Sequence, residues 1–249
     1  MFIAASYLFS EENQISQPRK TIVASDNQYS SSFSNDNWTR KIFERNKLTE
    51  EGYGLARLGF YEEAIAKFRL AADPTLIVQD HERAVPIGSI VEAYQREGKF
   101  EEALKEQEWF ILRRKMPSDR ALEKRIELRA LARARDTKNN KPIYEYIGYM
   151  KEKYPKFFPP NGYFVGMSDI YINDFIHLYD YLHDYDAGSI FMNEVIGYHA
   201  NHSDKAHRSA HAKDVREYTR VKHAWELDKS TGQHGHLKEV IRTSDFISW

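Results

Sequence analysis

Apolar residues recur at steps of three and four positions from Lys41 onward, a spacing that places them on one face of an α-helix. Breaks that contain Gly, Pro or Asn separate the helical spans. Apolar and polar residues alternate nowhere for long, so β-strands have no support. The chain is therefore predicted to be all-α after an N-terminal arm at residues 1–40. Much of that arm is rich in Ser, Asn and Gln, and it is expected to be flexible or packed at an edge.

The segments "LGFYEEAIAKFRLAADP" and "REGKFEEALKEQEWF" share a pattern of Gly, one residue, an aromatic residue, Glu-Glu and Ala, 39 residues apart. Gly59 and Gly98 stand between two helical spans, where a residue that adopts positive φ ends the first helix without strain. The aromatic residue is expected to wedge into the helix pair. Ala64 and Ala103 are expected where the two helices approach closely. The pattern predicts an antiparallel helical hairpin that occurs twice.

These residues resemble the tetratricopeptide repeat (TPR), a helix-turn-helix unit of about 34 residues. The resemblance is specific in two units, at about 45–78 and 84–117. The first unit matches the family's small and large positions with Gly52, Leu55, Gly59, Tyr61, Ala64, Phe68 and Ala71. The second unit keeps Tyr94, Gly98, Phe100 and Ala103, but has Gln107 and Phe110 in place of an aromatic residue and an alanine. The resemblance implies a right-handed superhelix of about five antiparallel helix pairs.

Later units continue the pattern in weaker form. In the third unit, Pro142 suits the first turn of the second helix, and the slots hold Leu131, Ile143, Ile147 and Met150. In the fourth unit, the aromatic and small slots hold Tyr179, Tyr185 and Gly188. A fifth pair is helical by pattern and only loosely similar to the repeat.

The expected organisation follows from these units. Helix pairs one to three occupy residues 41–155, and pairs four and five occupy residues 168–249. A loop at residues 156–167, rich in Pro and aromatic residues, separates them, because consecutive prolines followed by Asn-Gly cannot continue a helix.

In the resembled family, the first helices of stacked pairs line a concave face that binds peptides or helices of other proteins. The corresponding residues here are Asn46, Thr49, Tyr53, Arg57, Glu92, Gln95, Arg96, Arg125, Arg135, Asn173, His177, Asp180 and Tyr181. Family members that clamp a chaperone's terminal carboxylate have Lys and Asn where this chain has Thr49 and Tyr53, which argues against that ligand. The resemblance therefore implies an adaptor that binds another protein or peptide.

The net charge of the chain says little about its partner, and only one local stretch is strongly charged. The 249-residue chain has a net charge of −1, which gives no general attraction to nucleic acids or anionic membranes. Between Arg113 and Arg135, however, nine Lys or Arg residues accompany three acids. This stretch either docks an acidic peptide through Arg–carboxylate pairs or is a solvated helix face balanced by the Glu-rich hairpins. Neither a nucleic-acid partner nor membrane insertion is expected.

Four histidines lie within thirteen residues: His199, His202, His207 and His211. His207 and His211 are spaced to share one face of a helix, and a carboxylate from Asp204 or Asp214 would complete a zinc-type ligand set. No glutamate follows His207 as in the hydrolytic zinc enzymes, and a His-rich surface segment explains the same pattern. We therefore expect no cofactor, and keep His207 and His211 as the metal candidates.

Catalytic chemistry has little basis in the sequence. The chain contains no cysteine, so disulfides and thiol nucleophiles are excluded. It also has no Gly-rich phosphate loop and no nucleophile elbow. In "YDYLHDYD", Tyr179 and Tyr185 are expected to pack, while Asp184 and Asp186 cap or flank the next helix. The protein is expected not to be an enzyme.

Two alternatives to the adaptor differ from it in kind. One is a self-assembling scaffold, a homo-oligomer in which Trp225 and Trp249 contact another copy. The other is a metal-binding protein that uses the His199–His211 cluster. The apolar run at residues 1–9 is too short to span a bilayer, and it fits a frayed end better than a trimmed export signal. The sequence leaves the compartment unknown; it favours the cytoplasm slightly and does not exclude export.

Overall fold

The computed structural model describes residues 32–77, 84–112, 118–154, 165–201 and 208–244. Within these ranges the regular structure is helical and no strand occurs, which confirms the all-α prediction. The ten helices described are α1 (Ser32–Arg57), α2 (Tyr61–Ala71), α3 (Ala84–Arg96), α4 (Phe100–Leu112), α5 (Asp119–Thr137), α6 (Lys141–Lys153), α7 (Val165–Leu182), α8 (Tyr185–Asn201), α9 (Arg208–Thr231) and α10 (His236–Thr243).

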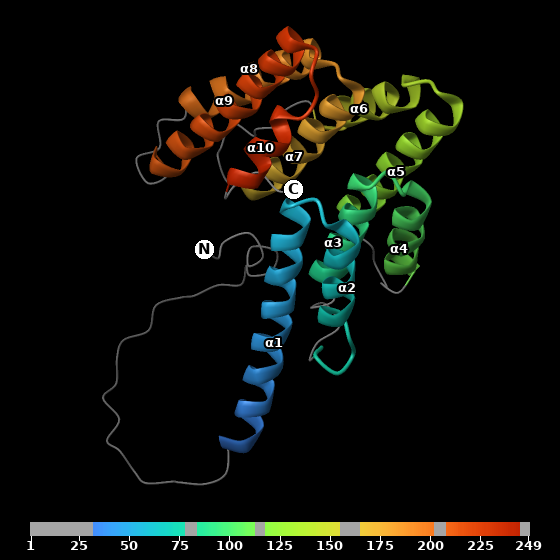
Figure 1. Cartoon of the computed structure of the whole chain (residues 1–249), viewed down its shortest axis with the longest axis vertical. Helices are drawn as coiled ribbons and strands as arrows, with labels where there is room; N and C mark the ends of the chain where they lie inside the picture. The colour runs from blue at the N-terminus through green and yellow to red at the C-terminus, as the bar shows by residue number, and fades with distance from the viewer. Residues whose placement is uncertain (1–31, 78–83, 113–117, 155–164, 202–207, 245–249) are drawn as a thin grey trace.

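Each described helix packs mainly on its neighbours in the chain, so the hairpins follow one another from α1–α2 to α9–α10 (Figure 1). Within the hairpins, α1 packs on α2, α3 on α4, α5 on α6, α7 on α8, and α9 on α10. Three of the second helices, α2, α4 and α8, also pack on the first helix of the next pair. The described chain is thus five helix pairs, and their right-handed superhelical path remains a prediction.

Four hairpin turns share one backbone geometry. The residue with positive φ is Gly59 (85°), Gly98 (75°), Lys138 (52°) or His183 (52°). The next residue's N–H then donates back to the helix, as from Phe60 to the Leu55 carbonyl (3.0 Å) and from Asp184 to that of Tyr179 (3.1 Å). Such bonds satisfy carbonyls left over at a helix end. The glycine prediction is confirmed, and the same turn recurs where the sequence has no glycine.

Small side chains lie where helices approach most closely. Ala64 and Ala103 are fully buried, as predicted. A Cβ atom on Gly52 would lie 2.5 Å from the Phe68 ring, so only glycine fits against this aromatic residue. Pro142 lies in the first turn of α6, which is also as predicted. The hairpin alignment derived from the two clear repeats therefore describes the observed packing.

Two helices begin earlier than the hydrophobic pattern indicates. α1 starts at Ser32, inside the arm expected to extend to residue 40, and α7 starts at Val165, inside the loop expected at residues 156–167. The first turn of α1, "SFSND", is dominated by residues with weak intrinsic helix propensity and has no apolar period. These residues extend a helix that the following amphipathic span already forms. An analysis of apolar periodicity does not detect such an extension.

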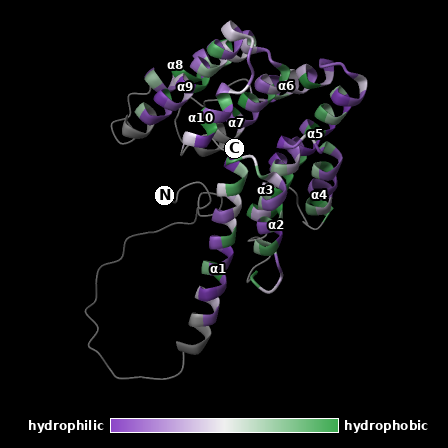
Figure 2. Ribbon diagram, in the orientation of Figure 1, coloured by the Kyte–Doolittle hydropathy of each residue, from purple (hydrophilic) through white to green (hydrophobic). Residues whose placement is uncertain are grey.

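Buried apolar side chains form a continuous core that includes residues from all ten described helices, and each helix combines apolar and polar positions (Figure 2). Within it, α7 is covered on nearly every side: from Tyr171 to Tyr179, every residue except Asn173 is buried. Its aromatic side chains pack on α8, with the Phe175 and Phe191 ring centroids 5.1 Å apart. α7 is therefore an interior helix. No described helix is long and apolar enough to cross a bilayer.

Candidate partner-binding face

Five residues of the predicted binding face lie at accessible positions on α1 and α3. Asn46, Tyr53, Arg57, Glu92 and Arg96 are exposed or half-buried there, and we call these five residues the α1–α3 stripe. The Ser89 hydroxyl on α3 donates a hydrogen bond to the Tyr53 hydroxyl at 3.2 Å. The Tyr53 ring packs edge-on against Phe68, with centroids 5.4 Å apart. The Ser89–Tyr53 bond joins the first two helix pairs, and the Tyr53–Phe68 contact lies within the first pair.

Arg57 lies in the last turn of α1 and forms no ion pair with any described residue. Its Nε atom is covered and makes no hydrogen bond within the described ranges. Arg96 occupies the same place on α3, two residues before the turn glycine. Burial lowers the pKa of Arg96, while Glu92 and Asp174 act in the opposite direction. A covered donor without an acceptor costs free energy, so Arg57 would gain from an external carboxylate.

Gln95 was predicted to line the face but instead belongs to a buried cluster that we call the α5–α7 charge network. Its members are Gln95, Arg120, Lys124, Glu127 and Asp174. Gln95 donates to a Glu127 carboxylate oxygen at 2.7 Å. The Lys124 ammonium lies 2.8 Å from Asp174 and 2.9 Å from Glu127, and Arg120 also pairs with Asp174. The network connects α3, α5 and α7.

Burial and the neighbouring charges determine which carboxylate of the network is ionised. Burial alone would raise the pKa of Asp174, but the Arg120 and Lys124 charges lower it below its usual value. Burial, reinforced by the Asp174 charge, raises the pKa of Glu127. Burial also raises the pKa of Tyr146, with Glu127 and Asp174 acting in the same direction. Asp174 is therefore the carboxylate that stays ionised against the two cations.

A second polar contact holds α7 at the same junction. Buried Glu123 on α5 accepts hydrogen bonds from Lys153 (2.7 Å), Tyr154 (2.5 Å) and Tyr171 (2.6 Å). Tyr171 lies on α7, and the other two donors lie at the end of α6. Sequence reasoning missed this group and most of the charge network. The one local signal was an ionisable residue, Asp174, within the apolar run of α7.

The other predicted face residues are dispersed. Thr49 is buried and donates to the Arg45 carbonyl at 2.9 Å, and His177 is buried in α7. Thr49, Gln95 and His177 thus contribute to the interior rather than to an open face. Arg125 follows Lys124 directly, about 100° further around the helix, and so does not share the face of the charge network.

Arg135 and Tyr181 meet around Phe100 at the start of α4. The Arg135 guanidinium lies over the Phe100 ring at 5.5 Å and also pairs with Glu101. Tyr181, at the end of α7, is 41% exposed, and its ring stands edge-on to Phe100 at 5.9 Å. The fourth-unit residues Asn173 and Asp180 are half-buried, and Asp180 accepts from the Trp225 indole N–H at 3.4 Å.

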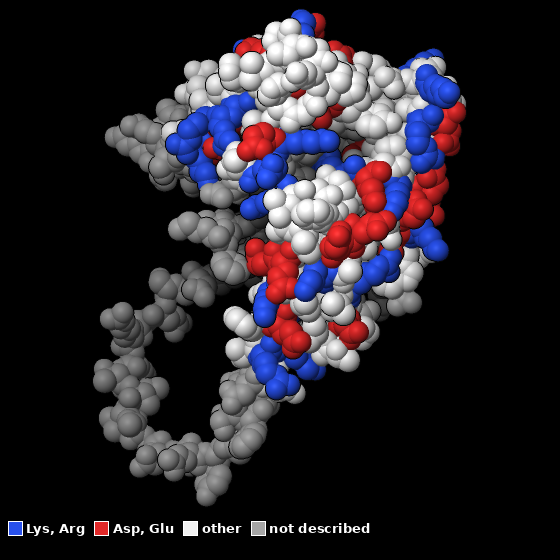
Figure 3. All heavy atoms as spheres, in the orientation of Figure 1, with Lys and Arg blue, Asp and Glu red and all other residues white. Residues whose placement is uncertain are grey.

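The basic segment of α5 is largely neutralised by neighbouring acids. Arg129 pairs with Glu108 at 2.7 Å, in addition to the pairs formed by Arg120, Lys124 and Arg135. Lys and Arg are interspersed with Asp and Glu on the face shown in Figure 3. This arrangement favours the balanced helix face over a basic docking surface. Residues 113–117 of the basic stretch lie outside the described ranges.

The predicted metal candidates are only partly described. His199 is buried, and its Nδ1 atom lies 3.3 Å from an Asp214 carboxylate oxygen, between α8 and α9. Burial raises the pKa of Asp214 to about 6. The His211 backbone belongs to α9, whereas residues 202–207, including His207, lie outside the described ranges. Among the described residues, no three His, Asp or Glu side chains gather as metal ligands.

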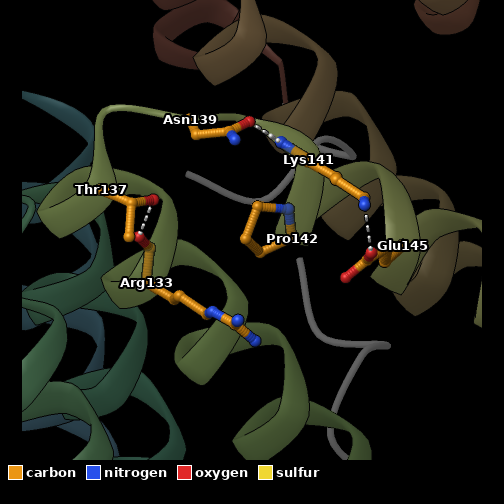
Figure 4. Close-up of a pocket in the computed structure, with 6 residues that line it drawn as sticks. All are labelled: Arg133, Thr137, Asn139, Lys141, Pro142 and Glu145. Atoms are coloured by element: carbon orange, nitrogen blue, oxygen red, sulfur yellow. Dashed lines mark hydrogen bonds and ion pairs between the residues drawn. The ribbon is translucent and has the colours of Figure 1, made fainter.

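A cavity of about 160 Å³ lies beside the α5–α6 turn (Figure 4). Its lining comes from this one hairpin: Arg133, Thr137, Asn139, Lys141, Pro142 and Glu145. Lys141 and Glu145 pair with each other at 3.7 Å, and Thr137 donates to the Arg133 carbonyl at 2.7 Å. The lining thus contains a Lys–Glu pair and a guanidinium but no paired nucleophile and base, so the cavity offers no convergent catalytic set.

Two aromatic predictions have opposite outcomes. Tyr179 and Tyr185 are buried as expected, and Asp184 caps α8 by accepting from the Ala187 N–H at 3.2 Å. In the self-assembly alternative, Trp225 would contact another copy, but Trp225 is fully buried inside the chain and does not have that role. Trp249 lies outside the described residues.

Comparisons of the chain with family models, curated proteins and solved structures found no match. The TPR assignment stays a prediction that rests on the residues quoted above.

Proposed function

We propose that this protein is an adaptor that binds an acidic segment of a partner protein along the α1–α3 stripe. Consecutive helix pairs that pack mainly on their neighbours are the architecture in which helix faces remain open for recognition. The resemblance to the TPR points to the same class of function. The proposal concerns one face of the molecule and assigns it no catalytic step.

The state of Arg57 is the observation that carries the proposal. Its covered Nε has no acceptor among the described residues, although most buried donors in folded proteins have one. An Asp or Glu side chain of a partner would supply both a hydrogen-bond acceptor and the opposite charge, in the planar geometry that a guanidinium favours. Arg96 on the adjacent helix extends the positive charge, and Tyr53 provides an aromatic surface between the helices.

The test compares two charge reversals. Arg57→Glu removes the proposed anchor without breaking an ion pair among the described residues. Lys105→Glu is the matched control, because Lys105 is exposed on α4, outside the stripe. The full chain would be screened on an array of acidic peptides, and the best binder measured by fluorescence anisotropy. We expect a Kd at least about tenfold weaker for Arg57→Glu, little change for Lys105→Glu, and weaker binding at high salt.

Circular dichroism would establish that both variants keep their helical content. Equal losses in the two variants, or binding that does not respond to either reversal, would contradict the proposed face. Failure of the wild-type chain to bind any acidic peptide would contradict the proposed partner class. Tyr53→Ala is a poorer probe, because the Tyr53 ring packs on Phe68 and its loss would also weaken the fold.

A further inference from the structure

Two histidines from different hairpins meet in the C-terminal part of the molecule. His183 lies in the turn between α7 and α8, and His234 lies in the connection between α9 and α10. Their rings stack with centroids 4.0 Å apart and an interplanar angle of 24°. Both residues are exposed to solvent. The fold thus brings together two accessible imidazoles that are far apart in the sequence.

The two Nδ1 atoms converge on one hydroxyl group. The Tyr185 oxygen lies 3.1 Å from Nδ1 of His183 and 2.8 Å from Nδ1 of His234. Its single hydrogen can serve only one of these nitrogens, so the other ring must donate its own proton. Ligands about 2.1 Å from a tetrahedral zinc ion are about 3.4 Å apart. The observed spacings are about 0.3 and 0.6 Å shorter than this value, so binding would require the two imidazoles to rotate out of their stacked arrangement and the donor atoms to move apart around the ion.

The surroundings of the three donor atoms carry negative charge. Asp180 and Asp228 lie close enough to Tyr185 to act on it electrostatically. Asp228 is fully buried and accepts a hydrogen bond from the His236 backbone N–H. His236 also places its Nδ1 atom 2.6 Å from the same carboxylate oxygen. Lys229, in the last turn of α9, pairs with Asp186. This excess of carboxylates favours a bound cation over a bound anion.

The framework that holds the donors is firm. His183 occupies the positive-φ position of the recurring turn, which fixes its backbone. Tyr185 is buried and packs near Trp225, with ring centroids 6.4 Å apart. A site built on supported side chains loses less conformational entropy on binding than one built on mobile side chains.

We propose that His183 and His234 form a surface site for a divalent transition-metal ion of the zinc class, with the Tyr185 hydroxyl as third donor. Imidazole nitrogen suits Zn²⁺, Cu²⁺ and Ni²⁺, and water completes the coordination. The bound ion connects the α7–α8 turn to the α9–α10 connection. The site is separate from the His199–His211 cluster and does not depend on the adaptor function.

The test is calorimetric titration of the full chain with ZnCl₂. We expect one saturable site that weakens at least about tenfold in His183→Ala and in His234→Ala, and that is lost in the double variant. His223→Ala is the matched control, because His223 is an exposed histidine on α9 away from the site, and it should bind zinc like the wild type. Tyr185→Phe keeps both imidazoles and should weaken binding severalfold.

Thermal unfolding gives a second readout, since an ion that binds only the folded state raises Tm. We expect this rise in the wild type and in His223→Ala, but not in the double variant. The metal-free Tm of each variant shows whether that variant has folded. If an alanine variant has not folded, His234→Gln is used in its place. Absence of saturable binding to the wild type would overturn the proposal. Undiminished binding in the double variant would place the ion elsewhere and would overturn it equally.

Discussion

Gly188 on α8 packs directly against the indole ring of Trp225 on α9. A Cβ atom at position 188 would lie 2.7 Å from the Trp225 Cζ3 atom, closer than side-chain atoms pack. Trp225 is fully buried and also stands edge-on to Tyr179, with ring centroids 6.5 Å apart. The absence of a side chain at residue 188 therefore sets how closely the fourth and fifth helix pairs approach.

Gly188→Ala is expected to destabilise the protein by about 1–3 kcal/mol, because overpacking at Trp225 outweighs the gain in helix propensity. Gly197→Ala is a control in the same helix, where an added Cβ meets no atom within 4 Å. That change should stabilise by about 0.5–1 kcal/mol. Urea denaturation of the two variants measures the difference. Stabilisation by both substitutions would show that Trp225 gives way at no cost.

The recurring turn predicts opposite effects of glycine at two equivalent positions. Lys138 has a φ of 52°, so Lys138→Gly should relieve strain and stabilise by up to about 1 kcal/mol. Gly98 has a φ of 75°, so Gly98→Ala should destabilise by about 1–2 kcal/mol. Thermal unfolding followed by circular dichroism would detect both shifts. Two shifts of the same sign would argue against a shared turn geometry.

Asp174 in the α5–α7 charge network should matter far more than a surface ion pair. Asp174→Asn leaves the buried Lys124 and the half-buried Arg120 without their main carboxylate, and should cost about 3–5 kcal/mol. Arg129→Gln breaks the exposed pair with Glu108 and should cost about 0–1 kcal/mol. Chemical denaturation at neutral pH would compare the two. Similar losses would show that solvent reaches the network.

The same carboxylate makes a prediction for acid. Because the folded-state pKa of Asp174 is lowered, its contribution is complete above the unfolded pKa of about 3.9. The contribution is lost as pH falls through the lower folded-state value. The stability gap between wild type and Asp174→Asn should therefore narrow below about pH 4. A gap that stays constant in acid would show that another group carries the charge dependence.

Asp214 should show the opposite pH dependence. Burial raises its pKa to about 6, so between about pH 4 and 6 the folded state retains a proton that the unfolded state releases. Stability then falls as pH rises from about 4 to about 6, and it depends little on this group above that range. Asp214→Asn removes this titration, so relative to wild type it should gain about 2–3 kcal/mol between pH 4 and 7. Denaturation curves at four pH values would test this. A relative gain by wild type would mean that the ion pair with His199 dominates.

Local chemistry made the hairpins predictable from the sequence. In each of the two clear hairpins, a turn glycine and a close-contact alanine lie within about six residues: Gly59 with Ala64, and Gly98 with Ala103. The structure confirms both the turns and the contacts. The third and fourth turns were harder to recognise, because Lys138 and His183 adopt the same backbone geometry without glycine. The sequence reveals such a turn only where glycine, which has no Cβ atom, occupies the positive-φ position.

The interior charges were hidden because they arise from tertiary packing. Lys124 and Asp174 are 50 residues apart, and neither periodicity nor composition brings α7 against α5. The face assignment failed at Gln95 for the same reason, since slot positions transferred from a repeat family assume that nothing covers the first helices. Arg57 is half-buried at the end of α1, and whether a partner binds it remains a proposal.

The α5–α7 charge network has a consequence for dissecting the molecule. A fragment that ended after α6 would keep Arg120 and Lys124 without Asp174, and the complementary fragment would keep that acid without either cation. Each fragment would then contain charged side chains whose ion-pair partners lie in the other fragment. The two halves are accordingly expected to behave as mutually dependent parts, soluble together and poorly folded apart, although each contains complete helical hairpins.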